Sequence, residues 1–321
     1  MGKQKPGGIT WCEKTWNPLR GCTRVSEGCR NCYAERTAGR GLQPGGPFVG
    51  FALPTADGPR WTGKVELMEH LLHQPASWRV PSTIFVNSMS DTFIEGPDQD
   101  QWKFTHQIYC SMLNARRHLF LVLSKRARRM LNFCHRWNIG VDPSIAIQTM
   151  DHIWNGVSVE NQPAADDRIQ LLLDTPCAHR FLSIEPLIGR VTLKPEWLGP
   201  GKVEWVIVGG ESGPGARPMH PDWVRDIRTA CEATGVKFHF KQWGEWLPGT
   251  QYTAELARRD PPEQTIFDCV DWEDGEWQKR GGGWTDDLSD AAMYRVGKKA
   301  AGRLLDDMTH DWMPKPEGAQ L

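Results

Sequence analysis

Three cysteines, Cys22, Cys29 and Cys32, form a C-x6-C-x2-C pattern within the polar, glycine-containing stretch GCTRVSEGCRNCYAER at residues 21–36. A thiolate is a soft ligand that favours iron-sulfur clusters, Zn(II) or Cu(I), and two cysteines three positions apart can point at one metal centre. The pattern therefore predicts a metal or cluster site. Three thiolates leave a fourth position free, and an open position distinguishes a catalytic centre from a closed structural one.

A structural zinc site is the alternative. Cys12 lies ten residues before Cys22, so it can complete a set of four cysteines. Four thiolates around one ion are a common structural zinc arrangement. The spacing alone leaves iron-sulfur and zinc open, and other stretches of the chain must decide between them.

The composition describes an ordinary globular protein. The 321 residues, 39% hydrophobic and 24% charged, suffice for one large α/β domain with additions or for two domains. A net charge of −1 gives no argument for nucleic acid, so such a partner would need a local basic patch. Nine cysteines without an export signal favour thiols and metal ligands over disulfides. We expect a cytoplasmic protein with no membrane partner.

Six short apolar runs organise the middle of the chain, at residues 82–87, 118–123, 153–159, 180–184, 204–208 and 236–240. Most are followed by apolar residues at helical spacing, which favours a parallel sheet with helices outside it. The sequence therefore predicts an α/β fold, a partial (β/α) barrel of about six to seven parallel strands. We assign this barrel to residues 1–246.

Two further segments carry local predictions. Residues 65–72, VELMEHLL, have the spacing of a short amphipathic helix. Residues 247–321 form a different kind of segment, which we expect to be a small β-rich extension with a hairpin that turns at Gly297.

Polar or charged clusters follow every predicted strand. In β/α barrels the chemistry lies at the carboxyl ends of the strands, so these clusters are candidates for a ring around one pocket, with the cysteine loop at the same rim. Helix caps and surface charges are the alternative interpretation, because loops generally begin with polar residues. The candidates are Ser88, Asp91, Ser124, Glu160, Glu185, Glu211, Arg217, Lys241 and Trp243.

Several motifs together carry a resemblance. The run TWNPLRGCTRVSEGCRNCYAE, with NSMSD, LVLSKR, WNGVSVENQ, FLSIEPLIG, VIVGGESGPGARPMH and FKQWGEW, resembles a family of phage and bacterial proteins of unassigned function. That family is related to radical SAM enzymes and more distantly to spore photoproduct lyase. The likeness covers about Thr10 to Trp246 and resumes near residues 302–314.

The resemblance implies a TIM-like partial barrel that holds a 4Fe-4S cluster on Cys22, Cys29 and Cys32. S-adenosylmethionine would bind the open iron and be cleaved by one electron to a 5'-deoxyadenosyl radical. The pattern departs from the common C-x3-C-x2-C spacing, and the Gly-Gly-Glu element at Glu211 follows a late strand instead of an early one.

The expected function is a radical SAM-type enzyme that acts on a nucleic-acid base or nucleotide, in DNA modification or repair, with an electron donor such as a flavodoxin or ferredoxin. A basic concentration between residues 116 and 129 supports a nucleic-acid substrate, although a solvated face is the simpler interpretation. The alternatives are the same chemistry on a peptide and a non-enzymatic zinc-binding protein that interacts with a phage or host partner.

Two groups of residues are assigned under the resemblance. The candidates for the S-adenosylmethionine pocket are Tyr33, Ser88, Ser124, Glu160 and Glu185. The candidates for the catalytic or substrate side are Asp91, Glu211, Arg217, Lys241 and Trp243.

Overall fold

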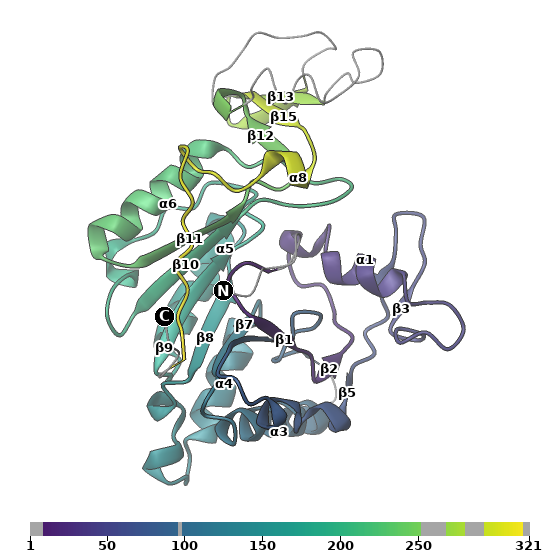
Figure 1. Ribbon diagram of the computed structural model, residues 1–321, viewed down its shortest axis with the longest axis vertical. Helices are drawn as coiled ribbons and strands as arrows, with labels where there is room; N and C mark the ends of the chain where they lie inside the picture. The colour runs from purple at the N-terminus through teal and green to yellow at the C-terminus, as the bar shows by residue number, and fades with distance from the viewer. Residues whose placement is uncertain (1–8, 96–97, 252–267, 280–291, 317–321) are drawn as a thin grey trace.

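The computed structural model describes residues 9–95, 98–251, 268–279 and 292–316. Its main feature is a curved sheet of seven parallel strands in the order β1-β6-β7-β8-β9-β10-β11 (Figure 1). The strands are β1 (Lys14–Trp16), β6 (Thr83–Val86), β7 (Leu119–Ser124), β8 (Ile153–Ser158), β9 (His179–Ile184), β10 (Val203–Gly209) and β11 (Lys237–Gln242). The predicted partial (β/α) barrel of about six to seven parallel strands is therefore confirmed.

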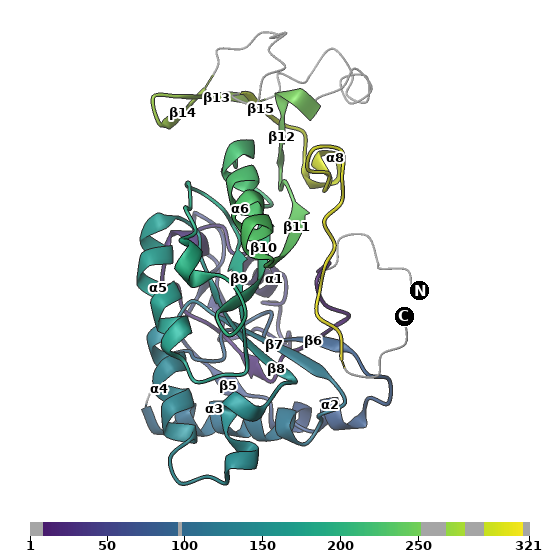
Figure 2. The ribbon, with the colours of Figure 1, turned by 90° about the vertical axis from the view of Figure 1, so that its left-hand side faces the viewer.

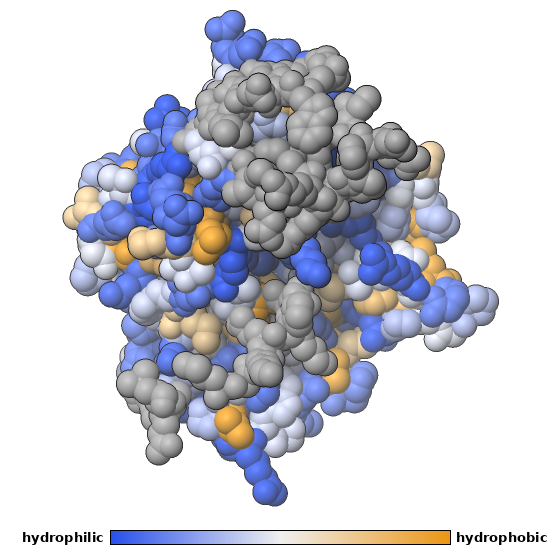
Figure 3. Space-filling model, turned by 45° about the horizontal axis from the view of Figure 1, so that its top comes forward, coloured by the Kyte–Doolittle hydropathy of each residue, from blue (hydrophilic) through white to orange (hydrophobic). Residues whose placement is uncertain are grey.

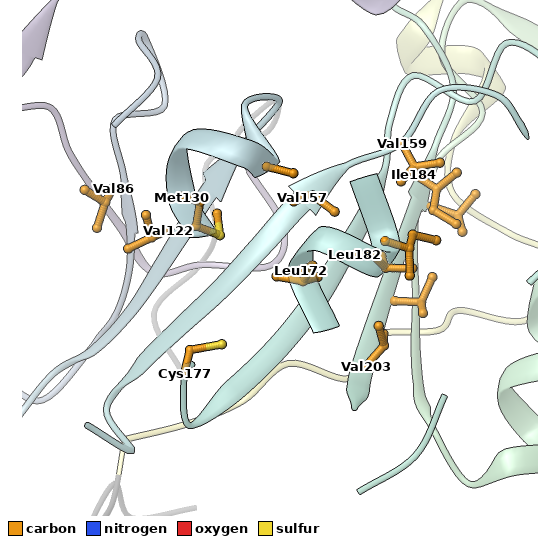
Figure 4. Close-up of a cluster of buried hydrophobic side chains, with 14 of the residues drawn as sticks. Val86, Val122, Met130, Val157, Val159, Leu172, Cys177, Leu182, Ile184 and Val203 are labelled. Carbon is orange, nitrogen blue, oxygen red and sulfur yellow. The ribbon is translucent and has the colours of Figure 1, made fainter. Parts of the chain in front are cut away.

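The long helices cover one face of this sheet, and the described segments before β1 and after α8 lie on the other side (Figure 2). These helices are α3 (Asp98–Leu113), α4 (Ala127–Trp137), α5 (Gln162–Asp174) and α6 (Pro221–Thr234). Because successive residues of a strand point to opposite faces, Val86, Val122 and Val157 all face the helices. There they join Met130 and Leu172 in the main hydrophobic core (Figure 4).

The helices begin and end at residues that the sequence makes suitable. The side chain of Asn161 accepts a hydrogen bond from the Ala164 amide at the start of α5. At the end of α6, Gly235 adopts the left-handed conformation with φ of 71°. These local signals fix where α5 begins and where α6 ends.

The concave face of the sheet carries a second, aromatic layer. Phe85, Trp154, Phe181 and Trp205 project from the strands into it, together with Leu119, Leu121 and Ile207. The segment before β1 contributes Trp11 and Cys12 to the same layer. These side chains therefore pack the concave side of the sheet between the strands and the segment before β1.

The region between β1 and β6 contains two small antiparallel strand pairs and two short helices. It contains β2 (Leu19–Arg20), β3 (Ala52–Leu53), β4 (Arg60–Trp61), β5 (Glu66–Leu67) and the helices α1 (Tyr33–Gly39) and α2 (Gln74–Ser77). The helix predicted over residues 65–72 is wrong. Glu66 and Leu67 pair with Arg20 and Leu19 as a strand, and a 3-10 helix follows at Glu69–Leu71, because this pairing overrides the local helical spacing.

A four-stranded antiparallel sheet in the order β12-β15-β13-β14 confirms the β-rich extension. Its strands are β12 (Trp246–Pro248), β13 (Cys269–Glu273), β14 (Glu276–Lys279) and β15 (Ala292–Arg295). The hairpin expected at Gly297 is wrong, because the helix α8 (Lys298–Ala301) follows Gly297, in a run of good helix formers. The remaining 3-10 turns are Glu27–Cys29, Pro143–Ile145, Ile147–Thr149, Pro195–Trp197 and Gly249–Gln251.

The C-terminal segment returns from this extension to the main sheet. Asp311 forms a bridge with His239 of β11, and the Pro314 carbonyl accepts a hydrogen bond of 2.9 Å from the Thr83 hydroxyl of β6. Residues 303–316 thus run from β11 across to β6 on the concave side (Figures 1 and 2). None of the described helices has both the length and the apolar character required to cross a membrane.

Candidate functional site

The cysteine loop, residues 21–32, lies across the carboxyl ends of the parallel strands. Its first part is held by the residues after β6 and β7, since Ser90 donates to the Gly21 carbonyl and Arg126 donates to the Thr23 carbonyl at 3.1 Å. Its last part reaches the residues after β10, where Asn31 donates to Glu211 at 2.9 Å. The loop and the strand ends therefore share one rim, as the sequence predicted.

Cys22, Cys29 and Cys32 are all partly exposed and free of disulfides. Burial, and then the negative charge of Asp91, raise the pKa of the Cys22 thiol to about 12. Cys32 and Cys29 also raise the pKa of Cys22, so the three thiols of this loop lie within electrostatic range of one another. Metal binding would displace their protons, because only the thiolate is a ligand.

No three His, Cys, Asp or Glu side chains of the described residues converge to hold one metal ion. A four-iron cluster makes a different demand, since each thiolate binds a different iron and the sulfurs stand further apart than around one tetrahedral ion. Three neighbouring free thiols in one loop are the donor set that such a cluster takes. The residues present fit a three-cysteine cluster.

Cys12, the fourth ligand of the zinc alternative, lies in the concave aromatic layer beside Trp11 and Phe85. It is 5% exposed, and burial raises the pKa of its thiol to about 12. A zinc site that includes Cys12 would have to draw this side chain out of the core.

Asp91 is the centre of the first network that holds the loop. Its carboxylate accepts from the Ser124 hydroxyl at 2.7 Å, from the Lys125 amide at 3.1 Å and from Arg126 at 2.9 Å. Arg126 then reaches the Thr23 hydroxyl at 2.5 Å. Asp91 and Ser124 thus position the cysteine loop through Arg126.

Glu160 is the centre of the second network. Its carboxylate accepts from Ser26 at 2.8 Å and lies 3.2 Å from Lys125 and 3.0 Å from Arg168. Burial alone would raise the pKa of this carboxyl, but Lys125 and Arg168 outweigh burial and hold it below its ordinary value of 4.5. A Cβ atom on Gly28 would lie 2.3 Å from Glu160 Cγ, so the loop backbone packs directly against this side chain.

Glu211 is the centre of the third network. It is 4% exposed and accepts from Asn31 at 2.9 Å and from the Arg217 guanidinium at 2.7 and 2.9 Å. Arg217 continues to the Glu27 carbonyl at 2.9 Å. Burial opposes ionisation of Glu211, but the hydrogen bonds from Arg217 and Asn31 lower its pKa. The Glu211–Arg217 pair therefore contacts the loop on both sides of Cys29, at Glu27 and at Asn31.

Arg217→Met, which keeps the aliphatic stem and removes the guanidinium, should lower the free energy of unfolding at pH 7 by about 2 kcal/mol, because buried Glu211 loses its charged partner. The stabilisation from Glu211 exists above the ordinary carboxyl pKa and is lost as pH falls through the lowered value. The difference from wild type should therefore shrink below pH 4.5 in urea unfolding curves. Arg190→Met removes an exposed pair with Asp226 and should cost under about 0.5 kcal/mol. If Arg217→Met and Arg190→Met lowered the free energy of unfolding equally, the Glu211–Arg217 pair would not hold the cysteine loop.

Glu185 and Lys241 form an ion pair on the concave side, at the ends of β9 and β11. The Lys241 amine lies 2.7 and 2.9 Å from the two carboxylate oxygens, and both side chains are mostly buried. Partial burial and the nearby charge of Lys241 lower the pKa of Lys298 in α8. Tyr33 interacts electrostatically with Glu185 and with Cys32. We call this pair the inner rim; its Glu185 lies within electrostatic range of Tyr33, which directly follows the cysteine loop.

The remaining candidates differ in their surroundings. Tyr33, at the start of α1, donates its hydroxyl to the Ser88 carbonyl, and the Ser88 hydroxyl donates to Asn17 at 3.1 Å. Trp243 is 1% exposed, packs against Phe240 and donates to the Leu304 carbonyl at 2.7 Å. The Trp243 side chain therefore belongs to the main hydrophobic core.

Two residues of the site, Asn31 and Arg168, were not among the candidates chosen from the sequence. Asn31, directly before Cys32, joins Glu211 to the loop. Arg168 lies on the buried stripe of α5, between Ala164 and Leu172. An arginine on an otherwise apolar stripe predicts a buried partner, and this signal identifies Arg168 as the partner of Glu160.

The basic concentration around β7 and α4 is partly neutralised within the fold. Lys125 and Arg126 hold Glu160 and Asp91, while Arg128 is exposed at the start of α4. The described part of the face in Figure 3 is mostly hydrophilic, with small separate hydrophobic patches.

The fold and the site together define a parallel α/β half-barrel with a three-cysteine loop over the carboxyl ends of its strands. The chain belongs to the family described as a protein of unknown function (DUF5131), whose model matches residues 7–314. Neither a curated protein nor a solved structure matches the chain significantly.

Proposed function

We propose that this protein is a radical SAM-type iron-sulfur enzyme that uses S-adenosylmethionine for radical chemistry on a nucleic-acid base or nucleotide. The observation that carries this proposal is the donor set. Three free, neighbouring cysteines share one loop over the carboxyl ends of a parallel half-barrel, while Cys12 is packed in a separate aromatic layer. Ligand sites of barrels lie at this end of the strands.

Cys22, Cys29 and Cys32 would hold the 4Fe-4S cluster and leave one iron open. When bound, such a cluster supplies the electron that cleaves S-adenosylmethionine to a 5'-deoxyadenosyl radical. The chain's own contribution is to hold the ligand loop. Asp91, Glu160 and Glu211 anchor it at three points, which fixes the positions of the thiols before any ligand binds.

The inner rim would orient the organic ligands. Glu185 offers acceptors and Lys241 offers donors; both side chains are mostly buried, and Glu185 lies within electrostatic range of Tyr33. A charged pair in such surroundings can hydrogen-bond a polar ligand and keep it in one orientation. Ser88 and Tyr33 add polar groups beside the cysteine loop.

The substrate class is supported by the resemblance to spore photoproduct lyase and by exposed Arg128, which can contact a phosphate. A one-electron donor such as a flavodoxin or ferredoxin would complete the system, because S-adenosylmethionine cleavage consumes an electron. DNA modification or repair is the process that this chemistry and substrate class fit best.

Metal analysis of anaerobically purified protein tests the proposal. We expect about four irons and four sulfides per chain. Cys22→Ala should lose most of both, whereas Cys12→Ala should retain them. S-adenosylmethionine should then be cleaved by the reduced wild-type protein only. Stoichiometric zinc without sulfide, lost in Cys12→Ala as well, would contradict the proposal and favour the four-cysteine zinc site.

A further inference from the structure

A cavity of about 660 Å³ lies at the end of the half-barrel opposite to the cysteine loop. Its walls come from the amino ends of β7 to β11 and from the C-terminal segment. Volumes of about 300–1,000 Å³ are typical of small-molecule sites. Nothing in the cysteine loop, or in the networks that hold it, contributes to this cavity.

The wall of the cavity contains an aromatic surface. The rings of Trp154 and His179 are stacked, with centroids 4.6 Å apart and planes at 16°. Trp312, 36% exposed, stands beside them with its centroid 6.5 Å from that of Trp154. Its backbone is fixed, since the Trp312 carbonyl is hydrogen-bonded by His239 at 3.0 Å. Flat rings held in this way can stack on a planar ligand.

Hydrogen-bonding groups lie next to these rings. His179 Nδ1 is 2.9 Å from Glu204 Oε2, so one edge of the aromatic stack is fixed by a carboxylate. Asp151 and His152 also line the cavity. Burial lowers the pKa of His152 to about 4, so this ring is neutral at physiological pH and acts as a hydrogen-bonding group and not as a charge.

Three exposed cations line the same cavity: Arg116, Lys237 and Lys315. None of the three forms an ion pair with a carboxylate of the described residues. The carboxylates of the wall are Asp151 and Glu204, and Glu204 is engaged by His179. The cations are therefore available to an anionic group of a ligand.

We propose that this cavity binds a nucleotide, with the base against the His179 and Trp312 rings, which the buried Trp154 supports from behind, and the phosphate at Arg116, Lys237 and Lys315. A base has the planar π-face that such rings bind, and its edge can hydrogen-bond the imidazoles and carboxylates. The nucleotide is either free or the end of a strand. This site is independent of the cysteine loop and of any cluster that the loop holds.

Calorimetric titration of the full-length protein tests the site. The probes are the four ribonucleoside 5'-monophosphates, the matching nucleosides, ribose 5-phosphate and a 5'-phosphorylated deoxytetranucleotide. We expect saturable binding of at least one monophosphate, or of the tetranucleotide alone if the ligand is a strand end, at about 1 mM or tighter. Nucleoside and ribose 5-phosphate should each bind at least about tenfold more weakly.

Matched variants separate the two halves of the site. Lys237→Ala combined with Lys315→Ala should weaken binding about tenfold, whereas Lys279→Ala, an exposed lysine of β14, should not change it. Trp312→Ala should weaken binding about tenfold and Trp312→Phe much less. Cys22→Ala should bind like wild type, so failure of the iron-sulfur proposal leaves this test intact. The nucleotide site would be overturned if no probe bound saturably, or if none of these variants changed the binding.

Discussion

Glu160→Gln is expected to lower the free energy of unfolding at pH 7 by about 3 kcal/mol, because it leaves the cations Lys125 and Arg168 without the carboxylate that they share. Glu160 is 1% exposed, so solvent cannot replace the lost charge. Glutamine keeps the volume against which Gly28 packs, and the substitution therefore isolates the charge from the packing. Urea unfolding followed by circular dichroism measures the difference.

The same variant makes a prediction about pH. The pKa of Glu160 lies below its ordinary value of 4.5, so its stabilisation is present above pH 4.5 and is lost as the pH falls through the lowered value. The gap between wild type and Glu160→Gln should narrow below pH 4.5. Glu66→Gln, which removes an exposed pair with Lys64, should stay within about 0.5 kcal/mol of wild type. A Glu160→Gln variant as stable as this control would show that the network does not hold the loop.

Most of the sheet and its helices could be predicted from the sequence because most strands contain a short apolar run and most helices carry an apolar stripe. The edge strand β1 was missed, since only three residues form it and only Trp16 among them is buried. The helix over residues 65–72 failed for a related reason. Pairing of Glu66 and Leu67 with β2 is a tertiary effect that local spacing does not contain.

The sequence predicts which residues meet at the site, because parallel strands bring their carboxyl ends to one edge of the sheet. The partners of those residues were not predictable. Asp91, Glu160 and Glu211 were assigned to cofactor and substrate, yet each forms hydrogen bonds that anchor the cysteine loop. The contact between Asn31 and Glu211 joins positions 180 residues apart, and no local pattern encodes such a contact.

Gly210, in the loop after β10, allows two loops to approach each other closely. A Cβ atom on Gly210 would lie 1.9 Å from the Trp243 carbonyl oxygen and 2.6 Å from its carbon. The Gly210 amide also donates to the Gln242 carbonyl at 2.9 Å. The loops after β10 and β11 therefore meet backbone to backbone, directly before Glu211.

Gly210→Ala should destabilise the protein by about 3 kcal/mol, because the clashing atoms belong to the main chain and cannot rotate away. Gly189→Ala is the matched control, since its Cβ would lie in ordinary contact at 3.4 Å from Asn161. The clash should also displace Glu211 and loosen Asn31 and Arg217, so limited proteolysis should cut the cysteine loop faster in Gly210→Ala at equal folded fraction. Equal stability and equal cleavage in the two alanine variants would mean that the two loops separate without disturbing the loop that carries the thiols.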